Sequence, residues 1–230
     1  DSRTKAIFLE NLGNPAFNIP DYEPIVEMAR RKGICVMVDN TFGMGGYLFR
    51  PFEWGANVSI HSATKWICGH GTALGGVVVD GGNFDWTPEK YPLLAAPSES
   101  YHGLVYKEVF GDAAFAGRVR VDGLRNIGPS ASPFNSFLML QGLETLSLRA
   151  ERCCSNALAI AEFLEGHPAV ESVNYVGLKS NPYYDLACKY LRNGFGGVLT
   201  FRVKGGFEAA AALVSRLDLI LHVGSVGDAK

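Results

Sequence analysis

The sequence predicts an α/β fold in which a mostly parallel sheet is flanked by helices. The first half alternates strand-like and helix-like patterns, which is typical of such a fold. Residues 34–40 (ICVMVDN) form a nearly continuous apolar run, as expected of a strand covered on both faces. The chain has 230 residues and 47% of them are hydrophobic, which suffices for one large domain and part of a second.

Four strands and one helix are predicted in residues 1–80. The strands cover residues 5–10, 34–40, 57–65 and 75–80, and we expect the first to be buried. Residues 21–32 predict a helix with Asp21 as its N-cap, an apolar stripe at Ile25, Met28 and Ala29, and Gly33 as its stop. The glycine-rich residues 43–46 (GMGG) lack a dinucleotide-binding fingerprint and are interpreted as a turn.

Residues 81–111 interrupt this alternation. The segment is rich in glycine, proline and aromatic residues and is too long for an ordinary connection. Its aromatic content favours an ordered, packed excursion over a disordered loop.

The second half is predicted to begin with helices and to end in a smaller unit. Helical periodicity starts at Pro133, with a break or kink at Gly142 and a long helix from about 143 to 164. Strand candidates follow at 170–176 and 196–203, with a small helix around 207–217. We expect a large domain over 1–165, including the long connecting helix, and the start of an incomplete α+β C-terminal domain over 166–230.

Composition argues against several classes of function. The formal net charge is -2 and no Lys/Arg-rich run occurs, so neither nucleic acid nor a membrane surface is an expected partner. No apolar stretch has the length of a transmembrane helix. The five cysteines are odd in number and lack metal-site spacing, which predicts free thiols in a reducing, cytoplasmic compartment and no metal site.

Residues with reactive or hydrogen-bonding side chains lie at the carboxyl ends of three predicted strands, where open α/β sheets bind ligands. Asn14 follows the first strand, Asp39 ends the second, and Ser62, Thr64 and Lys65 end the third. These types suit a pyridine aldehyde phosphate: the amine forms an imine and the carboxylate holds the pyridine nitrogen protonated. Hydroxyls can bind phosphate oxygens, and an amide can donate to the ring phenolate oxygen.

Each of these residues also has an ordinary structural explanation. An aspartate at a strand end often caps a turn, and a lysine is usually solvated at the surface. Residue types and order alone therefore leave both interpretations open.

Four sequence motifs favour the cofactor-binding interpretation: ENLGNP, VMVDNTF, HSATKWICGHG and LQGLETLSLRAER. Together they resemble the Cys/Met-metabolism family of enzymes that depend on pyridoxal 5′-phosphate (PLP), which have the aspartate aminotransferase fold (fold type I). The resemblance runs from about residue 5 to residue 230. Within that family, SYHG and NGFGGVLTF are most similar to the O-acetylhomoserine sulfhydrylase group.

The resemblance implies roles for the five strand-end residues. Lys65 would form the Schiff base with PLP, and Asp39 would pair with the pyridinium nitrogen. Ser62 and Thr64 would contact the phosphate, and Asn14 would face the phenolate oxygen.

Four further residues are considered for a role in the site, because of the same resemblance or because of their position in the sequence. Glu10 matches a family glutamate with a supporting role, and His61 is expected to be structural. His70 and His102 are each expected either to line a substrate channel or to pack.

The implied reaction is a γ-replacement on O-acetyl-L-homoserine by sulfide or a thiol, giving homocysteine or methionine plus acetate. Freed Lys65 would remove the Cα proton as a base. A cystathionine γ-synthase, a cystathionine γ-lyase or a methionine γ-lyase remains an alternative. The family assembles as dimers or tetramers, so a homo-oligomer is expected.

The sequence departs from the family at both ends. Members normally carry an N-terminal portion with a glycine-rich phosphate loop, an aromatic that stacks on the ring and a Tyr-x-Arg element. They also carry a C-terminal arginine for the substrate carboxylate, which Arg118, Arg120, Arg125 and Arg149 do not match. An internal portion of a longer enzyme is therefore expected, and a non-catalytic fragment or assembly module is the hypothesis from another class.

Overall fold

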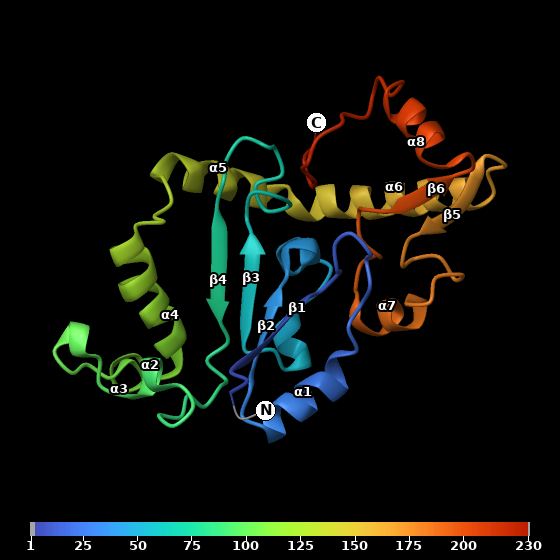
Figure 1. Ribbon diagram of the computed structural model, residues 1–230. Coiled ribbons are helices and arrows are strands. Elements are labelled where there is room, and N and C mark those ends of the chain that lie inside the picture. The colour runs from blue at the N-terminus through green and yellow to red at the C-terminus, as the bar shows by residue number, and fades with distance from the viewer. Residues whose placement is uncertain (1–2, 230) are drawn as a thin grey trace.

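A four-stranded sheet forms the centre of the first half in the computed structural model, which describes residues 3–229 (Figure 1). Its strands lie in the order β1 (Ala6–Glu10), β2 (Cys35–Asp39), β3 (Val58–Ser62) and β4 (Gly76–Asp80). The first three are parallel, whereas β4 runs antiparallel to β3. The predicted mostly parallel sheet is confirmed. Residues 63–75, which link β3 to β4, form turns and contain no crossover helix, and the chain reverses its direction there.

A helix is present where one was predicted, as α1 (Tyr22–Arg31), and it covers one face of this sheet. The side chains that it buries differ in part from the predicted apolar stripe. Its buried residues are Tyr22, Val26 and Ala29, whereas Met28 is exposed. Asp21 stands at the N-cap position without making a capping hydrogen bond, because its carboxylate instead accepts the hydroxyl proton of Tyr190. A contact from distant sequence thus replaces the expected cap.

The burial of β1 was predicted wrongly, whereas that of β2 was predicted correctly. Along β1 the exposure alternates, and Phe8 is 58% exposed. Ala6, Phe8 and Glu10 on one face of β1 are exposed, whereas Ile7 and Leu9 on the other face pack partly buried against the core. In β2, Cys35, Val36 and Val38 are all buried because neighbours pack on both faces.

The excursion after β4 is ordered and packed, as predicted. Residues 81–111 contain the short helices α2 (Pro92–Ala95) and α3 (Tyr106–Phe110), and α4 (Ala114–Arg118) follows them. Side chains of this region form a cluster against the sheet at Cys35 and Val58: Trp86, Tyr91, Leu94, Tyr106 and Ala114. The Tyr91 hydroxyl donates toward the carbonyls of Lys5 (2.7 Å) and Gly33 (2.9 Å), which fastens this cluster to the sheet.

Two helices run across the edge of the sheet at which β3 ends (Figure 1). They are α5 (Pro133–Glu144) and α6 (Leu146–Glu165), separated at Thr145. The predicted break is therefore present, but three residues after Gly142. Gly142 has another role, because a β-carbon there would lie 2.1 Å from the carbonyl oxygen of Cys68. Its lack of a side chain lets α5 contact the loop after β3.

A second, two-stranded sheet follows α6. β5 (Val170–Asn174) and β6 (Thr200–Val203) pair antiparallel, and α8 (Gly206–Val214) comes after β6. The strands and the last helix were predicted, whereas α7 (Tyr184–Tyr190) was not. Tyr190 of α7 packs edge-on against Tyr22 and Trp54.

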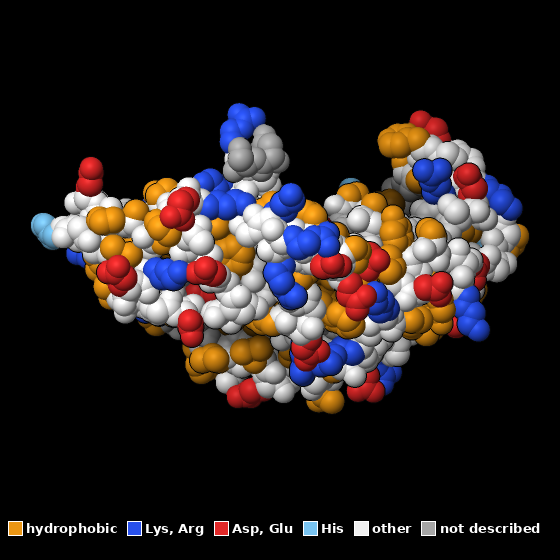
Figure 2. Space-filling model, turned by 90° about the horizontal axis from the view of Figure 1, so that it is seen from below, with side chains coloured by type: hydrophobic (Ala, Val, Ile, Leu, Met, Phe, Trp, Pro, Cys, Tyr) orange, Lys and Arg blue, Asp and Glu red, His pale blue; other side chains and the backbone are white. Residues whose placement is uncertain are grey.

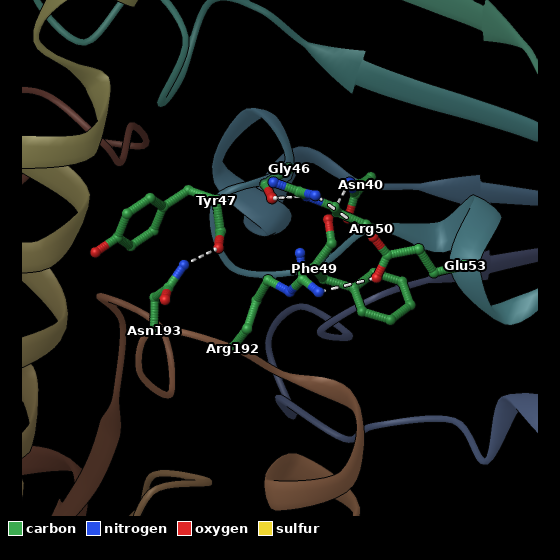
Figure 3. Close-up of polar contacts among 8 residues, drawn as sticks. All are labelled: Asn40, Gly46, Tyr47, Phe49, Arg50, Glu53, Arg192 and Asn193. Atoms are coloured by element: carbon green, nitrogen blue, oxygen red, sulfur yellow. Dashed lines mark hydrogen bonds and ion pairs between the residues drawn. The ribbon is translucent and has the colours of Figure 1, made fainter.

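The loop after α7 docks on the segment that follows β2 (Figure 3). Arg192 Nη2 donates to Glu53 Oε2 (3.0 Å), and Asn193 Nδ2 donates to the carbonyl of Tyr47 (2.9 Å). Because one hydrophobic core includes residues from both sides of position 165, the division into 1–165 and 166–230 stays a prediction.

The remaining short helical turns connect these elements. They are 3-10 turns at Thr41–Gly46, Pro51–Trp54, Glu99–Tyr101 and Gly111–Ala113, and a π-helical segment at Val119–Arg125. The first contains the predicted glycine-rich turn, in which Met44 (φ 52°) and Gly45 (φ 63°) are left-handed.

Charges of both signs alternate on the face shown in Figure 2, with apolar side chains between them. This agrees with the small net charge and with the absence of basic runs in the sequence. Among residues 3–229, the longest helices are too short or too polar to cross a membrane.

Candidate cofactor site

The carboxyl ends of β1, β2 and β3 bring part of the predicted site together. Asp39 is the last residue of β2 and pairs in register with Glu10 on one side and Ile60 on the other. Ser62 ends β3 and lies on the same face of the sheet as Ile60, because side chains alternate along a strand. The strand ends thus place Asp39 and Ser62 at one edge of one face.

Thr41 joins these two residues. Its backbone N–H donates to Asp39 Oδ1 (2.9 Å), and its hydroxyl oxygen accepts the backbone N–H of Ser62 (2.8 Å). Asp39 keeps its second carboxylate oxygen, and Ser62 its hydroxyl, without a hydrogen bond to any described residue. Both groups remain available to a ligand.

The loop after β1 carries Asn14 beside this edge. Glu10 Oε2 accepts the backbone N–H of Asn14 (2.7 Å), and the Asn14 side chain is exposed. The Asn11 N–H donates to the carbonyl of Asp39 (3.1 Å), which ties the start of this loop to β2. Glu10 thus holds the backbone of this loop, and its supporting role in the site stays a prediction.

Lys65 lies in the turn after β3 and faces a cavity of about 1040 Å³. Its Nζ donates to the hydroxyl of Ser225 (3.3 Å), a neutral partner from the far end of the chain. The cavity is lined by Thr64, Lys65, residues of the β3–β4 loop, Asn135 and residues between 219 and 228. Asn14, Asp39 and Ser62 do not line it, so the structure divides the predicted residues into two neighbouring groups.

Thr64 points into the β3–β4 loop. Its hydroxyl accepts the N–H of Gly75 (3.1 Å) and lies 3.3 Å from the Gly75 carbonyl oxygen. The hydroxyl thereby closes this loop, and its contact with a phosphate stays a prediction.

The three histidines named above have separate surroundings. His61 is buried, with Nε2 3.0 Å from Ser59 Oγ. Burial lowers its pKa, although the Asp39 carboxylate opposes that shift, so a neutral ring is favoured. His70 bonds the Cys68 carbonyl through Nδ1 (2.7 Å), and His102 is exposed in a turn. Neither His70 nor His102 lines the cavity at Lys65.

The family model described as Cys/Met metabolism PLP-dependent enzyme matches residues 1–230. The chain belongs to this family. The fold type I architecture that the sequence resemblance implied is therefore confirmed.

Family members from distant organisms align with the whole chain. The O-acetyl-L-homoserine sulfhydrylase 1 of Thermus thermophilus is 52% identical over 230 residues, which cover 100% of this chain and 55% of that protein. The homocysteine synthase of Schizosaccharomyces pombe is 51% identical over 232 residues, covering 100% of this chain and 54% of that protein. The chain spans about half the length of the curated relatives it matches.

Solved family structures agree with the fold. A putative O-acetylhomoserine (thiol)-lyase from Campylobacter jejuni superposes with a TM-score of 0.95 at 38% identity, covering 100% of this chain and 57% of that one. Its crystal structure contains a pyridoxyl-lysine phosphate. The metB protein of Corynebacterium glutamicum gives a TM-score of 0.79 at 34% identity, covering 99% of this chain and 51% of that one.

The residues of this PLP-dependent family member fit the cofactor chemically. The site offers an amine at Lys65, a carboxylate oxygen at Asp39 and a hydroxyl at Ser62, each with hydrogen-bonding capacity to spare. These are the group types that a pyridine aldehyde phosphate requires.

Sequence reasoning missed two residues of this site. Thr41 is part of the string VMVDNTF, two residues after Asp39. Its contact with Ser62 arises only when the two strands pair, so the sequence did not indicate it. Ser225 lies 160 residues after Lys65 in the sequence. No local sequence pattern indicates that two residues so far apart come into contact.

Proposed function

We propose that the protein containing this chain replaces the γ-substituent of O-acetyl-L-homoserine with sulfide or a thiol, giving homocysteine or methionine plus acetate. The observation that carries the proposal is the position of Lys65, whose amine faces a large cavity and bonds only a neutral hydroxyl among the described residues. The choice of reaction is supported by the identity of 51–52% to relatives named for homocysteine synthesis and O-acetylhomoserine sulfhydrylation.

Lys65 has two tasks in this proposal. Its amine attaches the cofactor covalently and, once released, takes a proton from Cα of the substrate. The second task requires a neutral amine, and the hydrogen-bond partner of Lys65 Nζ among the described residues is the hydroxyl of Ser225. PLP, when bound, supplies an electron sink for the carbanion that loss of this proton creates.

Asp39 and Ser62 hold the ring and the phosphate. The second carboxylate oxygen of Asp39 would accept a hydrogen bond from the protonated pyridine nitrogen of PLP, and the Ser62 hydroxyl would donate to a phosphate oxygen. In this proposal Thr64 makes a further contact with the phosphate, and Asn14 makes one with the phenolate oxygen of the ring.

We also propose that the protein works as a cytoplasmic homo-oligomer, a dimer or a tetramer. Large apolar side chains are exposed on α5 and α6: Phe134, Phe137, Leu140, Leu148, Ile160 and Phe163. Several large exposed apolar side chains on two successive helices support an interface with another subunit.

The covalent attachment is tested first. The PLP-loaded protein is treated with borohydride, which fixes PLP on its lysine, and the peptides are mapped by mass spectrometry. We expect the label on Lys65, and a label on another lysine overturns the assignment. A protein that takes up no PLP at all supports the non-catalytic fragment instead.

The substrate is tested with PLP-loaded protein that has not been treated with borohydride. Release of acetate and formation of homocysteine from O-acetyl-L-homoserine and sulfide are compared with turnover of methionine and of cystathionine. We expect the first reaction to have the highest kcat/KM. A higher value for cystathionine or methionine transfers the assignment to a γ-lyase, and a higher value with cysteine in place of sulfide transfers it to a cystathionine γ-synthase.

A further inference from the structure

The loop that follows Lys65 is held by one side chain from α6. Arg149, in the first turn of that helix, donates from Nη1 to the carbonyl of Trp66 (3.0 Å) and from Nη2 to the carbonyl of Gly142 (2.7 Å). Its Nε donates to Thr145 Oγ1 (3.1 Å). One guanidinium therefore connects the residue after Lys65 to the end of α5 and to the break between the two helices.

Two glycines allow this close packing. At Gly69 (φ +68°) a β-carbon would lie 2.1 Å from Arg149 Nη1, and at Gly142 a β-carbon would lie 2.1 Å from the Cys68 carbonyl oxygen. The guanidinium thus lies directly on bare backbone of the loop. A position so tightly enclosed leaves the loop little freedom to shift relative to α5 and α6.

The same loop fixes the main chain of Lys65 itself. The Gly69 N–H donates to the Lys65 carbonyl (2.8 Å), and the Cys68 N–H donates to the Ala63 carbonyl (2.8 Å). Displacement of residues 66–69 therefore moves the Cα from which the Lys65 side chain extends. A long, flexible side chain reaches a reacting atom reliably only when its own backbone is fixed.

Arginine is chemically suited to this position. Its described partners are two carbonyl oxygens and one hydroxyl, in three directions that match the planar fork of a guanidinium. A lysine keeps the charge but cannot donate to three separated acceptors with the same geometry. Burial lowers the pKa of Arg149, consistent with a group enclosed between the loop and the helices.

We propose that Arg149 is a positioning residue for Lys65, which it orients by joining loop 66–69 to the junction of α5 and α6. The inference rests on the proposed function of Lys65. The described hydrogen bonds of Arg149 go to Trp66, Gly142 and Thr145 and not to the Lys65 side chain, so its influence passes through the loop backbone.

The test compares Arg149→Lys with Arg152→Lys in the PLP-loaded protein. Arg152 is an exposed arginine three residues further along α6 and serves as the matched control. We expect Arg149→Lys to lower kcat at least tenfold, with KM changed less than threefold. We also expect a shift in the pH at which the visible absorbance of lysine-bound PLP titrates. Arg152→Lys should change none of these quantities.

A second variant covers the possibility that Arg149→Lys disturbs folding. In Arg149→Ala, added guanidinium at millimolar concentration is expected to restore at least part of kcat, because the ion can occupy the vacated position. Circular dichroism of both variants should match the parent protein. Parent-like kcat and absorbance titration in Arg149→Lys, or absence of guanidinium rescue in a folded Arg149→Ala, overturns the proposal.

Failure of this proposal is distinguishable from failure of the proposed function. Borohydride labelling of the unmodified protein decides whether Lys65 carries PLP. If Lys65 is labelled and Arg149→Lys behaves like its control, only the positioning role is wrong.

Discussion

The two groups of the candidate site are held in different ways. Asp39 and Ser62 end neighbouring strands and are joined by Thr41, which lies two residues after Asp39. Lys65 lies in a turn whose contacts come from Arg149 on α6 and from Ser225, 160 residues away. The first group is fixed by local sequence and sheet register, the second by tertiary packing.

This difference predicts different responses to perturbation. A residue held by the sheet is expected to keep its place when a remote element loosens, because its backbone pairs with neighbouring strands. A residue held by a loop loses its geometry when any of its remote partners shifts. The Lys65 amine is therefore expected to be the more sensitive part of the site.

Replacing Lys65 has the largest expected effect. Lys65→Ala removes both the covalent attachment and the base, and loss of a positioned base alone costs about 10²- to 10⁴-fold in rate. We expect no detectable turnover and loss of the visible absorbance of bound PLP. Lys179→Ala, at an exposed lysine, is the control and should retain both. Normal turnover in Lys65→Ala would falsify the assignment.

Replacing Asp39 is expected to have the next largest effect. Asp39→Asn keeps the shape of the side chain and an acceptor for the Thr41 N–H, but it removes the charge that stabilises a protonated pyridine. A hydrogen bond to a charged group contributes about 1.5–3 kcal/mol, so kcat should fall about 10- to 100-fold. PLP absorbance titrations should show cofactor still bound. Unchanged kcat, with the exposed Asp112→Asn as reference, removes Asp39 from its role.

The strand-borne group is also the part that sequence reasoning could predict. Strand ends are visible as apolar runs followed by polar residues, and parallel strands bring those ends to one edge, so Asp39 and Ser62 could be located together. The antiparallel direction of β4 and the exposure of β1 could not be read in this way, because each depends on which elements lie beside the strand. α7 and the contacts of Arg149 and Ser225 arise from packing between segments far apart in the chain.

The Thr41 bridge tests how local the first group is. Thr41→Val leaves the backbone N–H that serves Asp39 but deprives the partly buried Ser62 N–H of its acceptor. An unsatisfied donor of this kind costs about 1–3 kcal/mol in the free energy of unfolding, measurable by denaturant titration. Thr41→Ser keeps the hydroxyl and should stay near the parent value. Equal stability of the two variants contradicts the bridge.

Ser225 tests the loop-borne group with the smallest expected effect. Ser225→Ala removes one hydrogen bond of 3.3 Å to the Lys65 amine. Such a bond contributes about 0.5–1.5 kcal/mol, so kcat/KM should fall about two- to tenfold, with PLP still attached to Lys65. Ser215→Ala is a suitable control, because the Ser215 hydroxyl bonds only the carbonyl of Ala212 among the described residues. If Ser225→Ala retains full activity while Arg149→Lys loses it, the loop backbone alone orients Lys65. If both lose activity, the amine needs its loop and its hydroxyl partner together.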